Sequence, residues 1–167
     1  DKFFQAAGIK VLEGYGLTET GPVLAVRKQK DPVPGTVGPL LPDIEFRVVA
    51  EDGSACAPGE KGELHVRSEQ IMEGYYKNPE KTAEVLSSDG WLNTGDLVIY
   101  THNGEFRIVG RSKETIVLLG GENIEPQPIE EAILRSDFVD QVMIVGQDQK
   151  FLAALVYPNE ERIAELA

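Results

Sequence analysis

The sequence has a single cysteine, Cys56, among its 167 residues. One cysteine forms no disulfide within the chain, and it excludes a metal centre built from a cysteine cluster. Neither of the two histidines, His65 and His102, has a second metal ligand at a characteristic spacing, and we interpret both as solvated. The scarcity of cysteine is compatible with a reducing cytoplasm.

Long apolar runs and basic clusters are missing as well. No run approaches the ~20 apolar residues of a membrane-spanning helix, so we expect no transmembrane segment. The chain carries 16 basic and 28 acidic residues, for a formal net charge of −12. Because no basic patch interrupts this acidity, we expect no nucleic-acid partner. An excess of acid is typical of a solvated surface.

We expect the chain to be an excised piece of a longer protein, because it starts at Asp1 with neither an initiator Met nor a signal peptide. Turn signals at short intervals divide residues 1–109 into strands, whereas strands and helices mix in residues 110–167. These patterns predict a mixed α/β (α+β) fold, with a β-rich, distorted-barrel subdomain followed by a small α/β domain. Gly110 lies at the boundary and is the candidate hinge, since glycine tolerates wide changes of φ and ψ; an ordinary turn is the alternative.

Capping signals indicate where the helices begin and end. Gly8 suits the residue that follows a first helix, and Asn78-Pro79 suits the cap and first position of a second. Residues 126–135 place apolar side chains at helical spacing, and Asn159 can cap a last helix. The stretch LVIYTHNGEFRIVG predicts a β-hairpin with a type I′ turn at Asn103-Gly104.

The stretch EGYGLTETGP, residues 13–22, has neither helical nor strand periodicity. Gly14 and Gly16 permit a tight backbone path and the close approach of a ligand. Tyr15 between them presents a flat ring on which a base can stack. The alternative, from these residues alone, is a glycine-rich turn with a surface tyrosine.

Polar and charged groups that could carry chemistry occur in three places along the chain. Thr18 and Thr20 offer hydroxyls to phosphate oxygens, and Glu19 is a hard oxygen ligand suited to Mg²⁺. In DGWLNTGDL, Asp96 precedes an apolar strand, where a carboxylate can accept two hydrogen bonds from a ribose diol. Arg111 follows at the start of GRSKETIVLLGGEN. The alternatives are an aspartate that caps a turn and a basic strand end.

The order and spacing of these stretches resemble the adenylate-forming superfamily, which includes acyl-CoA synthetases, beetle luciferases and peptide-synthetase adenylation domains. YGLTET (residues 15–20) is similar to the adenine- and Mg-binding motif, and GWLNTGDL (residues 90–97) to the ribose-binding motif. GYYKNPEKT (residues 74–82) resembles a structural motif. GRSKETIVLLGGENIEPQPIE (residues 110–130) resembles the hinge and the start of the mobile C-terminal domain, in the form most similar to long-chain fatty-acid CoA ligases.

The resemblance implies roles for individual residues. The nucleotide-binding set that it implies is Gly14, Tyr15, Gly16, Thr18, Asp96 and Arg111. In this set Tyr15 stacks on adenine, Thr18 holds the α-phosphate and Asp96 binds the ribose hydroxyls. Glu19 would ligate Mg²⁺. The loop formed by Gly120, Gly121 and Glu122 would border the CoA channel.

The reaction implied by the resemblance has two halves. A fatty carboxylate attacks the α-phosphate of ATP in the presence of Mg²⁺, which gives acyl-adenylate and pyrophosphate. The C-terminal domain then rotates, and the thiol of CoA displaces AMP. Phosphoryl chemistry depends on positioning and charge neutralisation more than on covalent catalysis by the protein, and rotation about a hinge lets one site serve both steps.

Two departures from the family pattern bear on activity. The hinge residue of the family is commonly Asp or Lys, whereas Gly110 keeps rotation easy but lacks a side chain that could bias the resting state. No Ser/Thr/Gly-rich phosphate loop followed by Lys occurs, and the catalytic Lys near the family's C-terminus is absent. We expect the phosphate loop upstream of Asp1 and the catalytic Lys beyond Ala167. The chain alone then contains no catalytic residue and is expected to be inactive.

Two other functions stay open. An enzyme of the same superfamily could pass the acyl group from acyl-adenylate to a carrier protein. Alternatively, the chain could be an acidic, β-rich interaction module that is not an enzyme. Under the leading hypothesis the full-length enzyme is cytoplasmic, with peripheral membrane contact as an open alternative, and its partners are ATP, a fatty acid and CoA.

Overall fold

The computed structural model describes residues 2–165, which cluster into two compact units that divide between Ile108 and Val109. Antiparallel strands dominate the first unit, and short helices accompany strands in both. The predicted mixed α/β class is therefore confirmed. No helix among the described residues is long and apolar enough to cross a membrane.

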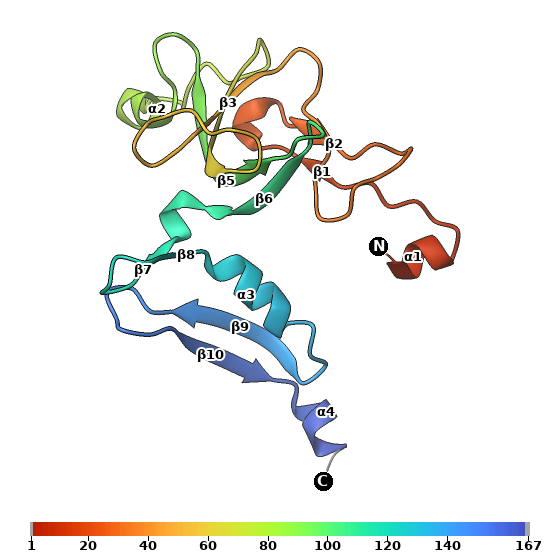
Figure 1. Cartoon of the computed structure of the whole chain (residues 1–167). Helices are drawn as coiled ribbons and strands as arrows, with labels where there is room; N and C mark the ends of the chain where they lie inside the picture. The colour runs from red at the N-terminus through yellow and green to blue at the C-terminus, as the bar shows by residue number, and fades with distance from the viewer. Residues whose placement is uncertain (1, 166–167) are drawn as a thin grey trace. The chain divides into compact units, whose positions relative to one another are not determined.

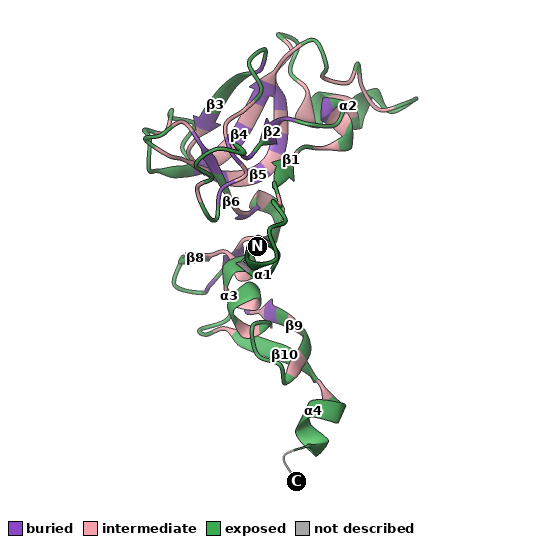
Figure 2. Cartoon of the chain, turned by 90° about the vertical axis from the view of Figure 1, so that its right-hand side faces the viewer, coloured by how far each residue is buried: buried purple, intermediate pink, exposed green. Residues whose placement is uncertain are grey.

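An antiparallel sheet forms the centre of the first unit (Figure 1). Its strands, in spatial order, are β3 (Glu45–Val49), β4 (Lys61–Arg67), β5 (Leu92–Tyr100) and β6 (Phe106–Arg111). Buried residues alternate with partly exposed ones along most of β5, as expected for a strand with one face against the core. Figure 2 shows the buried residues of this unit gathered on the central strands. The largest fully buried apolar side chains are Leu24, Leu64, Val66, Leu92, Val98 and Phe106.

The sheet continues beyond β6 but does not close. Gly38 pairs with Phe106 at the start of β6, and Leu40 pairs with Ala25. Ala25 belongs to β2 (Ala25–Val26), which pairs with β1 (Gly14–Tyr15). Within residues 2–165, β3 pairs only with β4 in this sheet, whereas a barrel requires its first and last strands to pair. The distorted-barrel part of the prediction is thus replaced by an open array.

Local capping confirms three of the predicted helices. Helix α1 (Lys2–Ala6) is followed by Gly8 with a φ of +76°. At α2 (Pro79–Val85), the Asn78 side chain accepts a hydrogen bond from the Lys81 amide at 3.1 Å. At α4 (Glu160–Ala164), Asn159 accepts one from the Arg162 amide at 2.9 Å. A side-chain oxygen in this position satisfies an amide that has no partner within the helix.

The hairpin between β5 and β6 forms as predicted, but its turn is of another type. A type I′ turn requires positive φ at both central residues. Gly104 has a φ of +78°, whereas Asn103 is not among the residues with positive φ. The Gly104 amide donates to the Thr101 carbonyl at 3.0 Å, and the Thr101 amide donates to the Glu105 carbonyl at 2.8 Å. The longer loop with one left-handed glycine replaces the predicted two-residue turn.

The second unit pairs a helix with a two-stranded sheet. Helix α3 (Pro126–Ile133) packs against β9 (Val139–Val145), which pairs antiparallel with β10 (Ala153–Pro158) (Figure 1). A small hairpin of β7 (Ile116–Val117) and β8 (Asn123–Ile124) follows the 3-10 turn η2 (Ser112–Glu114). The buried core of this unit consists of Ile116, Leu118 and Ile144. The predicted helix in 126–135 and the pairing of the last two strands are confirmed.

Candidate functional site

The stretch EGYGLTETGP folds into a tight loop that joins β1 to β2. The 3-10 turn η1 (Thr18–Thr20) lies between the two strands. The loop closes so tightly that a Cβ atom on Gly16 would lie 1.7 Å from the carbonyl oxygen of Pro22, and the next two nearest atoms are also backbone. A backbone contact cannot move aside as a flexible side chain can, so glycine is required at this position.

Thr20 holds the loop together from inside. Its side chain is fully buried, and its hydroxyl lies 2.9 Å from the Leu17 carbonyl oxygen and 3.2 Å from that of Pro22. The same hydroxyl accepts a hydrogen bond from the Leu17 amide at 2.9 Å. The prediction that Thr20 offers its hydroxyl to a phosphate is therefore wrong, because the group is enclosed by the loop. Thr18 is exposed and stays a candidate for that role.

An irregularity in β5 lies beside Asp96. The pairing of β4 with β5 shifts register between Glu63 and His65, and Gly95 has a φ of +71°. Glycine adopts this left-handed conformation without steric cost. The alternation of β5 continues through the irregularity, so Asp96 takes a buried position like Leu92 and Val98 and is only 6% exposed.

Asp96 and Tyr15 meet in the folded unit. The Tyr15 hydroxyl donates a hydrogen bond to Oδ2 of Asp96 at 2.6 Å, although 81 residues separate them along the chain. A bond to an ionised carboxylate at this distance is shorter and stronger than one between neutral groups. The residue predicted to stack on adenine thus lies beside the residue predicted to bind ribose.

Glu19 has a hydrogen-bond partner that the sequence did not indicate. The Tyr75 hydroxyl donates to Oε1 of Glu19 at 2.9 Å, across 56 residues of chain. This hydrogen bond, together with burial and the charge of Glu19, raises the pKa of Tyr75. The hydroxyl therefore keeps its proton, and stays a donor to Glu19, at neutral pH.

The donor set around Glu19 fits a magnesium ion that arrives with a nucleotide. Within residues 2–165, no three His, Cys, Asp or Glu side chains are grouped so that they could hold an ion. Mg²⁺ is usually bound by one or two carboxylates together with substrate phosphates, rather than by a cage of protein ligands. A single hard carboxylate in the loop that also carries Tyr15 meets that requirement.

The second unit carries the other predicted site residues. Arg111 and the loop of Gly120, Gly121 and Glu122 are exposed, and no atom lies within 4 Å of a Cβ built on either glycine. Gly110 is buried, and a Cβ there would lie 2.9 Å from Oε2 of Glu125. That carboxylate oxygen also accepts a hydrogen bond from the Thr115 hydroxyl. A side chain at position 110, the predicted hinge, would therefore have to displace Glu125.

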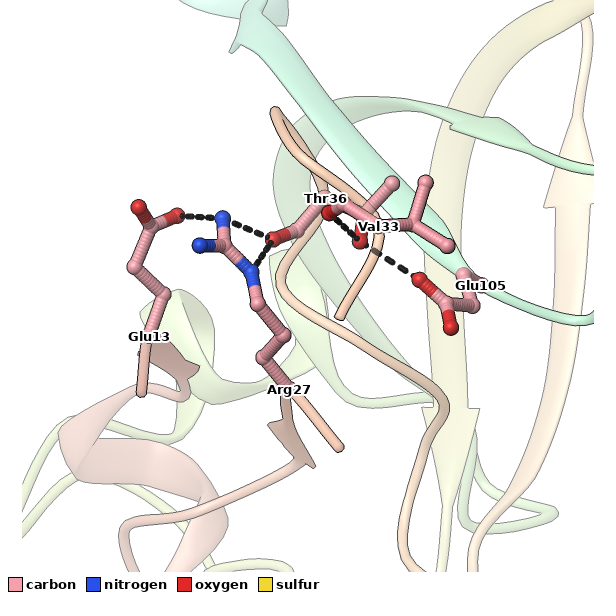
Figure 3. A network of polar contacts seen from close by, with 5 residues as sticks. All are labelled: Glu13, Arg27, Val33, Thr36 and Glu105. Carbon is pink, nitrogen blue, oxygen red and sulfur yellow. Dashed lines mark hydrogen bonds and ion pairs between the residues drawn. The ribbon is translucent and has the colours of Figure 1, made fainter. Parts of the chain in front are cut away.

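A buried polar network, which the sequence did not indicate, braces the strands next to Tyr15. Figure 3 shows the Arg27 guanidinium between the carboxylate of Glu13 and the carbonyl of Thr36. Its Nε and Nη2 donate to that carbonyl at 2.8 and 2.6 Å. The Thr36 hydroxyl lies 2.6 Å from Oε2 of Glu105. Arg27 is 3% exposed, and because Glu13 directly precedes β1, the network fixes the approach to Tyr15.

We expect Arg27→Met to destabilise the first unit by about 2–3 kcal/mol, because hydrogen bonds to a charged group are worth roughly 1.5–3 kcal/mol and the Thr36 carbonyl is left without them. Urea denaturation followed by the fluorescence of Trp91, the only tryptophan, measures the change. The matched control is Lys28→Met, at an exposed neighbour. Equal urea midpoints for the two variants would contradict the prediction.

Two ring-bearing side chains, Trp91 and His65, lie beside or within the central sheet. Trp91 packs beneath two guanidinium groups, those of Arg47 at 4.4 Å and Arg67 at 4.9 Å from its ring centroid. His65 is partly buried, so its predicted solvated state is wrong. Burial, and then the charge of Arg47, lower the pKa of His65.

Comparison with protein families gives two matches that together span most of the chain. A family model described as "AMP-binding enzyme" matches residues 1–76. A second, described as "AMP-binding enzyme C-terminal domain", matches residues 113–166. The first match contains the Tyr15 loop, and the second contains the loop at Gly120 and Gly121.

Curated relatives from plants and bacteria match nearly the whole chain. It is 47% identical over 172 residues to "Probable acyl-activating enzyme 16, chloroplastic" of Arabidopsis thaliana, with 96% of this chain and 24% of the relative covered. It is 44% identical, with the same coverage, to the Arabidopsis "Long-chain-fatty-acid--[acyl-carrier-protein] ligase AEE15, chloroplastic". It is 37% identical to the "Long-chain-fatty-acid--CoA ligase" of Haemophilus influenzae, over 87% of this chain and 26% of the relative. The chain thus spans about a quarter of the length of these relatives.

A solved structure shares the fold. The chain is similar to O-succinylbenzoate Coenzyme A Synthetase (MenE) from Bacillus subtilis, solved in complex with ATP and magnesium ion, with a TM-score of 0.81 and 27% identity. The match covers 94% of this chain and 33% of that structure.

Proposed function

This chain belongs to the family of AMP-binding, adenylate-forming enzymes, and from that premise we propose that it is part of an ATP-dependent ligase that activates a fatty acid. The hydrogen bond of 2.6 Å between Tyr15 and Asp96 carries the proposal. It joins, in one folded unit, the motif that resembles an adenine site and the motif that resembles a ribose site. The names of the relatives support a long-chain fatty acid as the substrate.

In the first half-reaction this chain binds and orients the nucleotide. The Tyr15 ring stacks on adenine, a contact worth ~1–3 kcal/mol in comparable sites. Asp96 accepts hydrogen bonds from the ribose hydroxyls, and the exposed hydroxyl of Thr18 donates to the α-phosphate. Glu19 holds Mg²⁺, which when bound neutralises charge on the phosphates. The fatty carboxylate then attacks the α-phosphate, forming acyl-adenylate and releasing pyrophosphate.

In the second half-reaction the unit that starts near Gly110 contributes its own residues. Arg111 belongs to the proposed nucleotide-binding set, and the loop from Gly120 to Glu122 borders the path of the incoming thiol. The open space around the two glycines supports that role, since a narrow pantetheine arm needs close access to backbone. The thiol attacks the acyl carbonyl and AMP leaves.

The acceptor thiol has two candidates. CoA is favoured by the GGEN-x-x-P-x-P-I-E pattern that begins at Gly120, which resembles long-chain fatty-acid CoA ligases. A carrier protein is favoured by the 44% identity to the acyl-carrier-protein ligase, which exceeds the 37% identity to the CoA ligase. The decisive comparison offers the complete enzyme both acceptors at equal concentration, with palmitate and ATP.

The experiment that tests the proposed function is ATP–pyrophosphate exchange by the complete enzyme. We expect exchange that depends on a fatty acid and is lost without it, because only acyl-adenylate formation is reversible with pyrophosphate. An enzyme that exchanges no label with any chain length from C8 to C18 would overturn the proposal. The interaction-module alternative would then return.

We propose that the 167-residue chain by itself catalyses no exchange. It contains neither the phosphate loop nor the catalytic lysine of the family pattern, so it can contact a nucleotide but cannot neutralise the transferred charge. The assay is the same exchange reaction on the isolated chain, with the complete enzyme as the positive control. Turnover well above the blank would contradict this expectation.

A further inference from the structure

The stretch GYYKNPEKT, residues 74–82, resembles a structural motif and has no role in the function proposed above. Its Tyr75 hydroxyl nevertheless reaches the loop that carries Glu19, where it donates to Oε1 at 2.9 Å. Its neighbour Tyr76 points elsewhere: that side chain is 87% exposed, and the Lys77 ammonium lies over its ring. Of the two adjacent tyrosines, only Tyr75 is placed to act on the site.

The position of Tyr75 is fixed by the start of helix α2. Its amide donates to the hydroxyl of Thr82 at 2.9 Å, and that hydroxyl lies 2.9 Å from the Asn78 carbonyl oxygen. Gly74 leaves room for this contact, since a Cβ there would lie 2.8 Å from Cγ2 of Thr82. The capped first turn of α2 therefore anchors the backbone from which Tyr75 extends.

The segment before Tyr75 also holds the backbone of the Glu19 turn. The Met72 amide donates to the Glu19 carbonyl at 2.9 Å. The side-chain amide of Gln70 donates to the carbonyls of Thr20 and Val23 at 2.6 and 2.8 Å. Residues 70–75 thus fix both the backbone of the turn and one oxygen of its carboxylate.

We propose that Tyr75 is a positioning residue for the metal ligand Glu19. η1 is only three residues long, and a glutamate on so short a turn has several rotamers available. The bond to Oε1 selects one of them, and Oε2 is the oxygen that the proposal assigns to the ion. Partners that orient a metal ligand in this way are typically worth 10–100-fold in metal affinity or activity. The inference rests on the proposed function, since it takes Glu19 as the ligand of Mg²⁺.

The test measures metal binding directly, without turnover. Calorimetry gives the Kd of a non-hydrolysable ATP analogue for the complete enzyme, once with Mg²⁺ and once with EDTA. The Kd in EDTA divided by the Kd with Mg²⁺ measures the contribution of the metal. We expect Tyr75→Phe to reduce that ratio about tenfold while the Kd in EDTA stays within twofold of wild type. Tyr76→Phe, the matched control, should change neither value.

Each outcome bears on a different statement. An unchanged ratio in Tyr75→Phe overturns the inference, as does an equal loss with and without metal, which would mean that Tyr75 only supports the fold. Glu19→Gln removes the proposed ligand itself. If the ratio is unchanged in this variant, Glu19 does not bind the metal and the inference is overturned, even in an enzyme that activates fatty acids normally. The wild-type enzyme could also show a large ratio but exchange no pyrophosphate. That result would overturn the proposed function and leave the inference about Tyr75 standing.

Discussion

The Gly16→Ala substitution is expected to lower the affinity of the complete enzyme for AMP at least a hundredfold. The new methyl group would lie 1.7 Å from the Pro22 carbonyl oxygen, 2.7 Å from its carbonyl carbon and 2.9 Å from Cα of Val23. All three are backbone atoms, so the loop has to open. Overpacking typically costs about 1–3 kcal/mol; an overlap this deep with backbone belongs at the upper end or above, and about 2.8 kcal/mol is a hundredfold in affinity. Opening the loop moves Tyr15 away from Asp96 and disrupts the hydrogen bonds that enclose Thr20.

The sharpest comparison is with Gly14→Ala, two residues earlier. A Cβ on Gly14 would lie 3.6 Å from the Ala25 carbonyl oxygen, an ordinary contact, so the loop should close and the melting temperature should stay near that of wild type. AMP affinity from calorimetry and melting temperature from scanning calorimetry are measured for both variants. If Gly16→Ala binds AMP within threefold of wild type, the loop is not the rigid element that we describe.

The second large effect is expected for Asp96→Ala, which should reduce kcat/KM for ATP in pyrophosphate exchange by 10²–10⁴. Two hydrogen bonds from the ribose to a carboxylate, at roughly 1.5–3 kcal/mol each, give this range. The substitution also removes the acceptor of the Tyr15 hydroxyl, so the ring that we propose stacks on adenine loses the hydrogen bond that holds it in place. We therefore expect Tyr15→Phe and Asp96→Ala to be non-additive, because both remove the same hydrogen bond.

The control for Asp96 is Asp89→Ala, in the exposed turn that precedes β5, where the carboxylate accepts a hydrogen bond from the Ser87 hydroxyl. We expect this variant to keep kcat/KM for ATP within twofold of wild type. The combined variant of Tyr15→Phe with Asp96→Ala completes the cycle. Strictly additive losses would show that the two side chains act on the nucleotide independently, against the coupling that the structure suggests.

Much of the local structure could be predicted because its causes lie within a few residues of chain. Asn78 and Asn159 each cap a helix, because the side-chain oxygen accepts a hydrogen bond from the amide three residues ahead. The apolar run at residues 97–100 is likewise enough to specify the last part of β5 as a strand. The turn at Asn103-Gly104 was the local failure. The same dipeptide fits several hairpin loops, and the strand register, which extends over both partners, selects among them.

The candidate site was predicted as a set of residues but not as an arrangement. The motifs around Tyr15 and Asp96 stand out in sequence through their glycines and polar groups. Thr20 looked equivalent to Thr18, yet the closing of the loop buries one hydroxyl and leaves the other exposed. The bulge at Gly95 could not be foreseen either, because it appears only when β4 supplies a register to deviate from.

The sequence by itself determined the family, the order of the strands and helices, and the side chains available for a nucleotide, since these depend on residue type and short spacing. The tertiary structure alone decided which of those side chains meet. Tyr15 bonds to Asp96, Tyr75 to Glu19 and Thr36 to Glu105 across 81, 56 and 69 residues. Contacts at such separations depend on how the strands and loops pack in the folded unit. Forming them costs the entropy of closing long loops, and a local sequence pattern does not reveal which loops close.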